Sequence, residues 1–209
     1  MSVRYGQITG RNLDRIATIS DGVFAIAMTL IVLEIRIPDP GTIHSESELL
    51  TGLLGLSPRL VTYLLSFLTI GIFWNGQQTQ LNRFSATDRA LTWLHLLFLA
   101  VVALLPFSTS LLAEFISYRL ALLLYWANIF LLGTLLYAAW TYALGAGLVR
   151  EDSRAAVSDA IKRRIVVAQA LYAFGAVLCI VSTYWSIAFI VLVQVQFAIA
   201  PRVGILSRF

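Results

Sequence analysis

Two polar residues, Ser20 and Asp21, lie near the start of a long apolar segment that runs from Arg15 to Glu34. A carboxylate inside a membrane-spanning helix costs about 2.5–3.5 kcal/mol on insertion scales, so it normally has a partner or lies on an ion path. Asp21 is therefore either a hydrogen-bonded lock between helices or an ion site. Its candidate partners are Arg15, Trp74, Asn75, Gln77, Gln78 and His95.

No other residues stand at the spacing of a catalytic or metal site. The chain has no Walker loop and no GxGxxG, HExxH or GxSxG motif, and His44 and His95 have no cysteine or carboxylate at ligand spacing. The lone cysteine, Cys179, excludes an intramolecular disulfide. We expect no catalytic residues, no metal and no cofactor. A TVGYG filter is also absent, so any ion selectivity would depend on side chains.

The composition is that of an integral membrane protein. Hydrophobic residues make up 59% of the chain, charged residues 12%, and the mean hydropathy is +0.82. Basic residues are scattered between apolar runs, which argues against a nucleic-acid partner. We predict one all-α domain over residues 1–209 with six transmembrane helices, because the run over 165–201 is too long for one span and folds at Ser182–Ser186. The predicted spans are about 14–36, 58–82, 89–113, 118–149, 162–182 and 185–204.

The distribution of basic residues predicts that both termini are cytoplasmic. With six spans, only Arg36, Arg59 and Arg119 fall outside. The twelve inside are Arg4, Arg11, Arg15, Arg83, Arg89, Arg150, Arg154, Lys162, Arg163, Arg164, Arg202 and Arg208. The outer segment between Arg36 and Arg59 is acidic, and we expect a short interfacial helix within it, over 46–54.

The first helix has two different faces. At about 100° per residue, Ile26, Leu30 and Leu33 form one aliphatic stripe with Thr29 at its edge. Asp21 points away from this stripe, so one face could be anchored in its own subunit while the other is offered to further copies. The same aliphatic spacing also fits ordinary packing between membrane helices.

These residues resemble the lysosomal transmembrane potassium channel family in its short bacterial form with six helices. The resemblance rests on an arginine followed by F-S-D, here Arg15, Ile19, Ser20 and Asp21, and on a G-V-F-A-I-A-x-T-L-x-V-L-E run over 22–34. A second block extends from residue 73 through 88 to 94–109. Together the two blocks cover the N-terminal half of the chain.

The resemblance implies a homotetrameric cation channel in the bacterial inner membrane, with permeant potassium and with lipid and its own copies as partners. Four first helices would line a central pore. The constriction would fall on Ile26, Leu30 and Leu33, and a hydroxyl ring on Thr29. The signature Arg15, Ser20 and Asp21 would tie the first helix to the second and third, with supporting polar partners at Trp74, Asn75, Gln78 and His95.

Four residues depart from the family pattern. Ile19 replaces the phenylalanine of F-S-D, Gln77 and Gln78 stand where many members have histidines, and His95 replaces an asparagine. Two other functions stay open: a secondary transporter that uses Asp21 as a proton or cation site, and a sealed structural bundle without ion flux.

Overall fold

The computed structural model describes residues 12–153 and 156–199, and their regular structure is helical apart from one isolated bridge between Phe84 and Val149. The α-helices in chain order are α1 (Leu13–Leu30), α2 (Glu46–Gly55), α3 (Ser57–Leu81), α4 (Arg89–Ala103), α5 (Leu105–Glu114), α6 (Arg119–Gly145), α7 (Ala156–Val177) and α8 (Thr183–Ile199). The short 3-10 helices are η2 (Ile31–Glu34), η3 (Pro40–Thr42), η4 (Glu151–Ser153) and η5 (Leu178–Ile180).

Five helical segments among the described residues are long and apolar enough to cross a membrane. They are Leu13–Glu34, Glu46–Leu81, Arg89–Glu114, Arg119–Gly145 and Val157–Ile180. The apolar helix α8 is shorter, with 17 described residues, and the predicted end of the sixth span at 204 lies outside the described residues. These segments support a multi-pass membrane protein.

Three boundaries differ from the predicted spans. Helix α6 ends at Gly145 rather than at 149, because Gly147 has a φ of 70° and the amide of Leu148 bonds back to the Ala143 carbonyl. Helix α7 begins at 156 rather than 162, so the charged linker continues into the helix. The chain reverses between Ile180 and Thr183, just before the turn predicted at 182–186.

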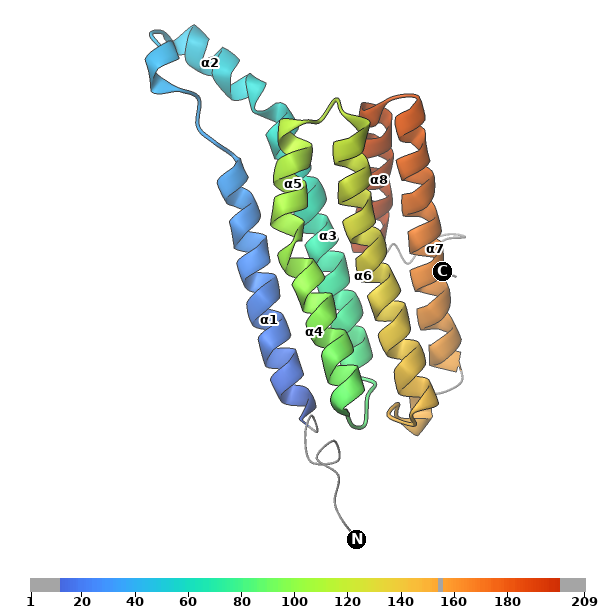
Figure 1. Ribbon diagram of the computed structural model, residues 1–209. Helices are drawn as coiled ribbons and strands as arrows, with labels where there is room; N and C mark the ends of the chain where they lie inside the picture. The colour runs from blue at the N-terminus through green and yellow to red at the C-terminus, as the bar shows by residue number, and fades with distance from the viewer. Residues whose placement is uncertain (1–11, 154–155, 200–209) are drawn as a thin grey trace.

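The third predicted span is two helices joined at Leu104. Pro106 has no amide hydrogen, so the Val102 carbonyl loses its usual helical donor. The Leu104 amide instead bonds to the Val101 carbonyl at 3.2 Å, a tighter turn than the α-helix. The break lies where α4 gives way to α5, and the two helices continue in nearly the same direction (Figure 1).

The helices run side by side in one bundle, with α1 at one edge against α3 and α4, and α7 and α8 at the other (Figure 1). Helix α2 projects from the end opposite the start of α1. It is the predicted interfacial helix: Ser45 caps it by accepting from the Glu48 amide, and Leu50 and Leu54 are 60% and 66% exposed.

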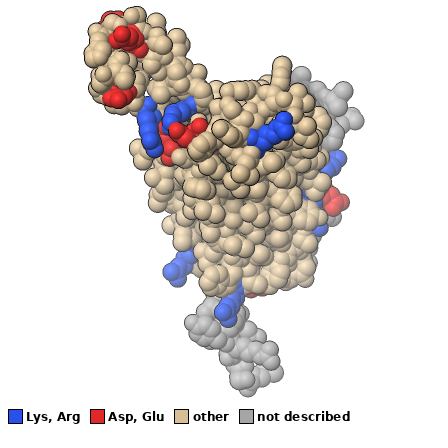
Figure 2. Space-filling model, turned by 45° about the horizontal axis from the view of Figure 1, so that its top comes forward, with Lys and Arg blue, Asp and Glu red and all other residues tan. Residues whose placement is uncertain are grey.

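Charged side chains gather toward the ends of the bundle and leave an uncharged belt between them on the face shown (Figure 2). The end that holds the start of α1 carries seven described basic residues: Arg15, Arg83, Arg89, Arg150, Lys162, Arg163 and Arg164. The other end carries Arg36, Arg59 and Arg119. We call these the basic end and the outer end. Five further predicted inside arginines (Arg4, Arg11, Arg154, Arg202 and Arg208) lie outside the described residues.

Candidate pore-lining helix and its anchor

Helix α1 buries one face and leaves the opposite face uncovered in the single chain. Phe24 is 2% exposed and Ile31 is fully buried against the bundle. The predicted stripe is open instead: Ile26 is 60% exposed, Leu30 44% and Leu33 69%. The structure thus brings the three predicted constriction residues onto one free aliphatic surface, which we call the α1 stripe.

The stripe continues beyond the end of the α-helix. Helix α1 ends at Leu30, and the chain then forms the 3-10 helix η2, whose Glu34 ends the predicted motif. A 3-10 helix has three residues per turn, so residues i and i+3 lie one above the other. Leu33 therefore stays above Leu30 on the free face, although the helix is shorter than the predicted 14–36.

Thr29 is exposed beside the stripe, and its hydroxyl has a defined orientation. The hydroxyl donates to the backbone carbonyl of Ile26 at 2.8 Å. Because its one proton is used inside the helix, the Oγ1 lone pairs remain available on the exposed side. An oxygen of this kind can accept a hydrogen bond from water or contact a cation.

Asp21 is anchored to α3 by two hydrogen bonds. Its Oδ1 accepts from Trp74 Nε1 and from Gln78 Nε2, each at 2.8 Å. Trp74 and Gln78 are one helical turn apart, so both donors project from the same side of α3. Asp21 is itself exposed, and the anchor lies at the edge of the free face of α1.

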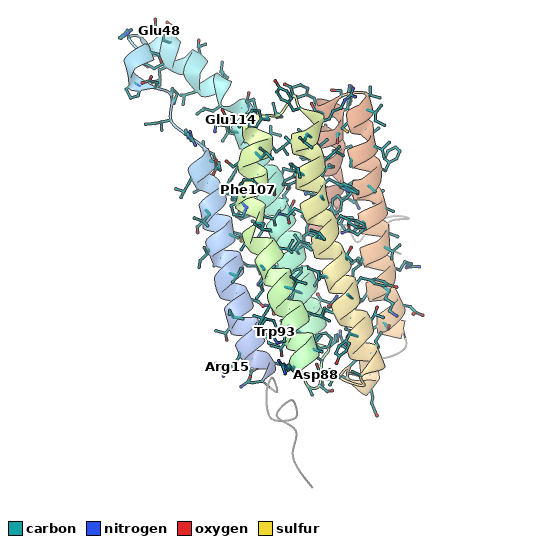
Figure 3. The ribbon with its side chains drawn as sticks, viewed as in Figure 1. Arg15, Glu48, Asp88, Trp93, Phe107 and Glu114 are labelled. Atoms are coloured by element: carbon teal, nitrogen blue, oxygen red, sulfur yellow. The ribbon has the colours of Figure 1, made fainter. Side chains whose placement is uncertain are left out.

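The rest of the signature is arranged differently from the expected network. Ser20 is buried, and its hydroxyl donates to the Ile16 carbonyl of its own helix at 2.7 Å. Arg15 and Ile19 are exposed, with Ile19 extending the stripe and Arg15 at the base of α1 (Figure 3). Among the described residues, the partners of Asp21 come from α3 and not from Arg15.

His95 and Asn75 do not reach Asp21. His95 is buried, and its Nδ1 lies 3.1 Å from Gln77 Nε2. Because an amide nitrogen can only donate, Nδ1 is the acceptor and the ring proton is assigned to Nε2. The ring also packs edge-on against Phe84, with centroids 6.0 Å apart. Asn75 faces a cavity on another side of α3.

A second polar cluster, which the sequence did not single out, fixes the outer end of η2. Arg59 donates to the Glu34 backbone carbonyl at 3.1 Å and pairs with the Glu114 carboxylate at 2.6 Å. The Glu34 side chain accepts from the Ser110 hydroxyl at 2.7 Å. Glu114 lies at the outer end of α5 (Figure 3). In the sequence, this cluster could have been sought among the charged and hydroxyl residues near the outer ends of the spans.

A third polar cluster lies inside the bundle. The Tyr125 hydroxyl is 2.8 Å from Thr69 Oγ1, which also accepts from Gln194 Nε2 at 2.6 Å. Ser66 and Thr109 extend the cluster at 2.6 Å from one another. It joins α3, α5, α6 and α8, so it holds the bundle together away from the α1 stripe.

The large hydrophobic side chains exposed along α1 are all aliphatic. In the part of the chain that the structure describes, no group of three His, Cys, Asp or Glu residues could hold a metal ion. The free face combines an aliphatic stripe with the exposed hydroxyl of Thr29, while the carboxylates of Asp21 and Glu34 are bonded to neighbouring helices. Apolar constrictions occur in ion channels.

Comparisons with known proteins show the family to which the chain belongs. The family model of the endosomal/lysosomal potassium channel TMEM175 matches residues 15–106. A potassium channel of Chamaesiphon minutus is 33% identical over 191 residues, which is 88% of this chain and 93% of that protein. A potassium channel of Streptomyces collinus is 40% identical over 102 residues, about half of each chain.

A vertebrate relative and a solved structure complete the comparison. The human endosomal/lysosomal proton channel TMEM175 is 34% identical over 98 residues, which is 44% of this chain and 19% of that protein. The crystal structure of a lysosomal potassium-selective channel TMEM175 homolog from Chamaesiphon minutus superposes with a TM-score of 0.79 at 29% identity, covering 90% of this chain and 96% of that one. The chain described here therefore belongs to the TMEM175 family of ion channels and is not an enzyme.

Proposed function

We propose that this protein is a potassium-selective cation channel that works as a homotetramer in the bacterial inner membrane. The observation that carries the proposal is the uncovered α1 stripe, in a chain that aligns with a potassium channel over 88% of its length. One helix per subunit can line a pore when several copies meet around an axis. In a tetramer, four stripes would face that axis while the Asp21 anchor holds each α1 to its own bundle.

The mechanism follows from the chemistry of the stripe. Rings of Ile26, Leu30 and Leu33 form an apolar neck that offers an ion no oxygen ligands in place of water. Sodium holds its water more tightly than potassium, so a neck that removes water penalises sodium more. Such a neck also blocks conduction when it dewets. Selectivity then arises without a TVGYG carbonyl filter.

A hydroxyl within the neck and a carboxylate beyond it would assist the ion. Thr29 Oγ1 is oriented to accept, so four of these hydroxyls could replace part of the lost hydration shell. Glu34 lies at the outer end of η2 and attracts cations toward the mouth of the pore. The basic end faces the cytoplasm in this account, as the seven described basic residues there favour.

The secondary transporter that would use Asp21 as a coupling site has less support. Both donors to Asp21 come from α3, which suits a lock between helices. The relatives reported above are named as channels. Asp21→Asn separates the two functions, because the neutral amide oxygen can still accept from Trp74 and Gln78. A channel keeps passive conduction in this variant, whereas a carrier coupled through Asp21 loses its flux.

Purified protein in liposomes tests the proposed function. Vesicles that contain the protein are loaded with either potassium or sodium, and vesicles without protein are the control. Passive efflux is measured after a second permeant ion is supplied outside to balance the charge that leaves. The proposal expects rapid potassium efflux that exceeds sodium efflux in wild type and in Asp21→Asn. Absence of flux under every gradient would leave a sealed bundle, and flux that needs a proton gradient and disappears in Asp21→Asn would establish a transporter.

A further inference from the structure

A cavity lies between α3, α6, α7 and α8, and none of its lining residues comes from α1. Its enclosed volume is about 90 Å³, and it is open on one side, so it can hold only part of a larger ligand. Its walls are mostly aliphatic and aromatic. The lining residues that matter for the argument are Ile72, Phe73, Gln80, Arg164, Gln169 and Tyr172.

Two glutamine side chains that line this cavity have amide oxygens that accept no hydrogen bond from the described residues. Gln80 is 1% exposed; its Nε2 donates to the Leu136 carbonyl at 3.0 Å, and its Oε1 has no partner within the described residues. Gln169 is arranged in the same way, with Nε2 toward the Ile129 carbonyl at 3.4 Å and an unpaired Oε1. Because each amide nitrogen is committed to a carbonyl, each free atom is an acceptor.

The cavity also carries a cation and no lining carboxylate. The Arg164 guanidinium lies 5.8 Å from the centre of the Phe197 ring, which holds it at the wall. Lys162 is a second basic residue on the same helix turn but does not line the cavity. A ligand that suits this site therefore has a negative charge and at least one hydroxyl that can donate to an amide oxygen.

The charged lining residue lies toward the basic end of the cavity. On α3, Gln80 is nearer the basic end than Ile72 by eight residues, about 12 Å of helix. On α7, Arg164 is likewise nearer the basic end than Tyr172 by eight residues. The deeper part holds Ile72, Phe73 and Tyr172 together with the amides of Asn75 and Gln169. The positive charge of Arg164 is thus on the side where a lipid of that leaflet has its headgroup.

We propose that this cavity binds an anionic phospholipid whose headgroup carries hydroxyls. The phosphate pairs with Arg164, a headgroup hydroxyl donates to Gln80 Oε1, and one acyl chain lies along Ile72, Phe73 and Tyr172. Basic pockets between membrane helices on the cytoplasmic side bind lipid headgroups in this way. The site is separate from the α1 stripe, so the proposal does not depend on ion conduction.

Two other occupants fit the cavity less well. A free phosphate would leave the apolar inner wall without a partner. The chain's own residues 200–209, which follow α8, contain Arg202 and Arg208 and no acidic side chain, so their charge has the same sign as that of Arg164. An acyl chain with an anionic headgroup matches both parts of the cavity.

Native mass spectrometry of the delipidated full-length protein measures the binding directly. Phosphatidylglycerol is the probe, phosphatidylcholine is the zwitterionic comparison, and inorganic phosphate is added as a competitor. Arg164→Gln is expected to weaken phosphatidylglycerol binding about tenfold, the usual effect of losing a charge-assisted hydrogen bond. Lys162→Gln, which removes the same charge outside the cavity, is the matched control and should leave the affinity nearly unchanged.

A second variant tests the apolar part of the site. A Cβ added at Gly76 meets Leu136 Cδ1 at 3.5 Å, an ordinary contact, so Gly76→Ala narrows the cavity without strain and should weaken binding. Gly71→Ala adds a methyl where nothing lies within 4 Å and serves as its control. Equal affinity for both lipids, equal losses in Arg164→Gln and Lys162→Gln, or displacement by inorganic phosphate would overturn the proposal.

Discussion

At the scale of single residues, α1 separates two kinds of side chain that the sequence places next to one another. Asp21 is bonded to α3, while Ile26 and Leu33 remain 60% and 69% exposed. This arrangement suits the proposed pore helix. The hydrogen bonds of Asp21 fix the rotation of α1, and the open aliphatic surface, which begins five residues later, would contact the ion path.

The Thr29 hydroxyl gives the first prediction. Thr29→Val keeps the shape of the side chain and removes the oxygen, so the barrier for potassium should rise by about 0.5–1 kcal/mol, a conductance about two- to fivefold lower. Single-channel recording in lipid bilayers measures the change. Thr134→Val is the control, because Thr134 makes the same bond to a carbonyl of its own helix, at 2.8 Å, on α6. Equal conductance in both variants would remove Thr29 from the pore.

The Asp21 anchor could be predicted in part from the sequence. A carboxylate in a span requires a partner, and Trp74 and Gln78 were among the candidates because they lie on the next span. The choice between them and His95 depends on how α3 and α4 are rotated, which periodicity does not specify. His95 turns toward Gln77 instead, an interaction between two polar residues on different spans.

The anchor itself can be tested by removing one donor. Trp74→Phe keeps an aromatic ring on α3 but loses the 2.8 Å bond to Asp21, and we expect a loss of about 1 kcal/mol in unfolding free energy. Thermal unfolding in detergent micelles measures this. Trp93→Phe is the control, since Trp93 is 62% exposed on α4, facing outward near the basic end (Figure 3). A matching loss in Trp93→Phe would contradict a specific anchor.

At the scale of elements, the contact between α7 and α8 requires a glycine. A Cβ at Gly175 would meet Ile190 Cγ1 at 2.8 Å and Phe189 Cδ1 at 3.1 Å. Gly175→Ala should therefore destabilise the protein by about 1–3 kcal/mol through overpacking. The same melting experiment on Gly71→Ala should show no such loss, because that site is open. Equal stability of the two variants would mean that α7 and α8 are not packed this closely.

The approximate positions of the apolar helices and of the short helix α2 were predictable, because both depend on the length and charge of local runs. Apolar segments of 20 residues or more have few alternatives to a membrane span. The break at Leu104 and the early end of α1 at Leu30 were not predictable in detail. Both features depend on one or two backbone hydrogen bonds and on packing against neighbouring helices. Pro106 did indicate where the break at Leu104 would fall.

At the scale of the whole molecule, the described bundle has one edge helix that is incomplete on its own. Helix α1 packs against α3 and α4 on one side and exposes a continuous aliphatic surface on the other (Figure 1). Lipid can cover such a surface, but the oriented Thr29 hydroxyl can also accept a hydrogen bond from water or contact a cation. In the proposed tetramer this face would lie on an internal axis.

Native mass spectrometry of the wild-type protein in detergent tests the number of copies. The account expects a species of four chains as the main assembly. A monomer or dimer that stays fully active in liposomes would contradict a central pore built from four α1 helices, because two helices cannot enclose a path. The number of subunits could not be predicted from residue spacing, because the aliphatic stripe of one helix has the same spacing in a ring of three, four or five copies.

If Ile26 forms the selective neck, a change at this residue must alter ion selectivity. Reversal potentials measured with potassium on one side of the membrane and sodium on the other test this. Wild type is compared with Ile26→Asn and with Leu131→Asn, the control, because Leu131 is 49% exposed on α6. The account predicts that the potassium-to-sodium permeability ratio falls toward one in Ile26→Asn and keeps its wild-type value in Leu131→Asn. An unchanged ratio in Ile26→Asn, in a variant that still conducts, would contradict the account.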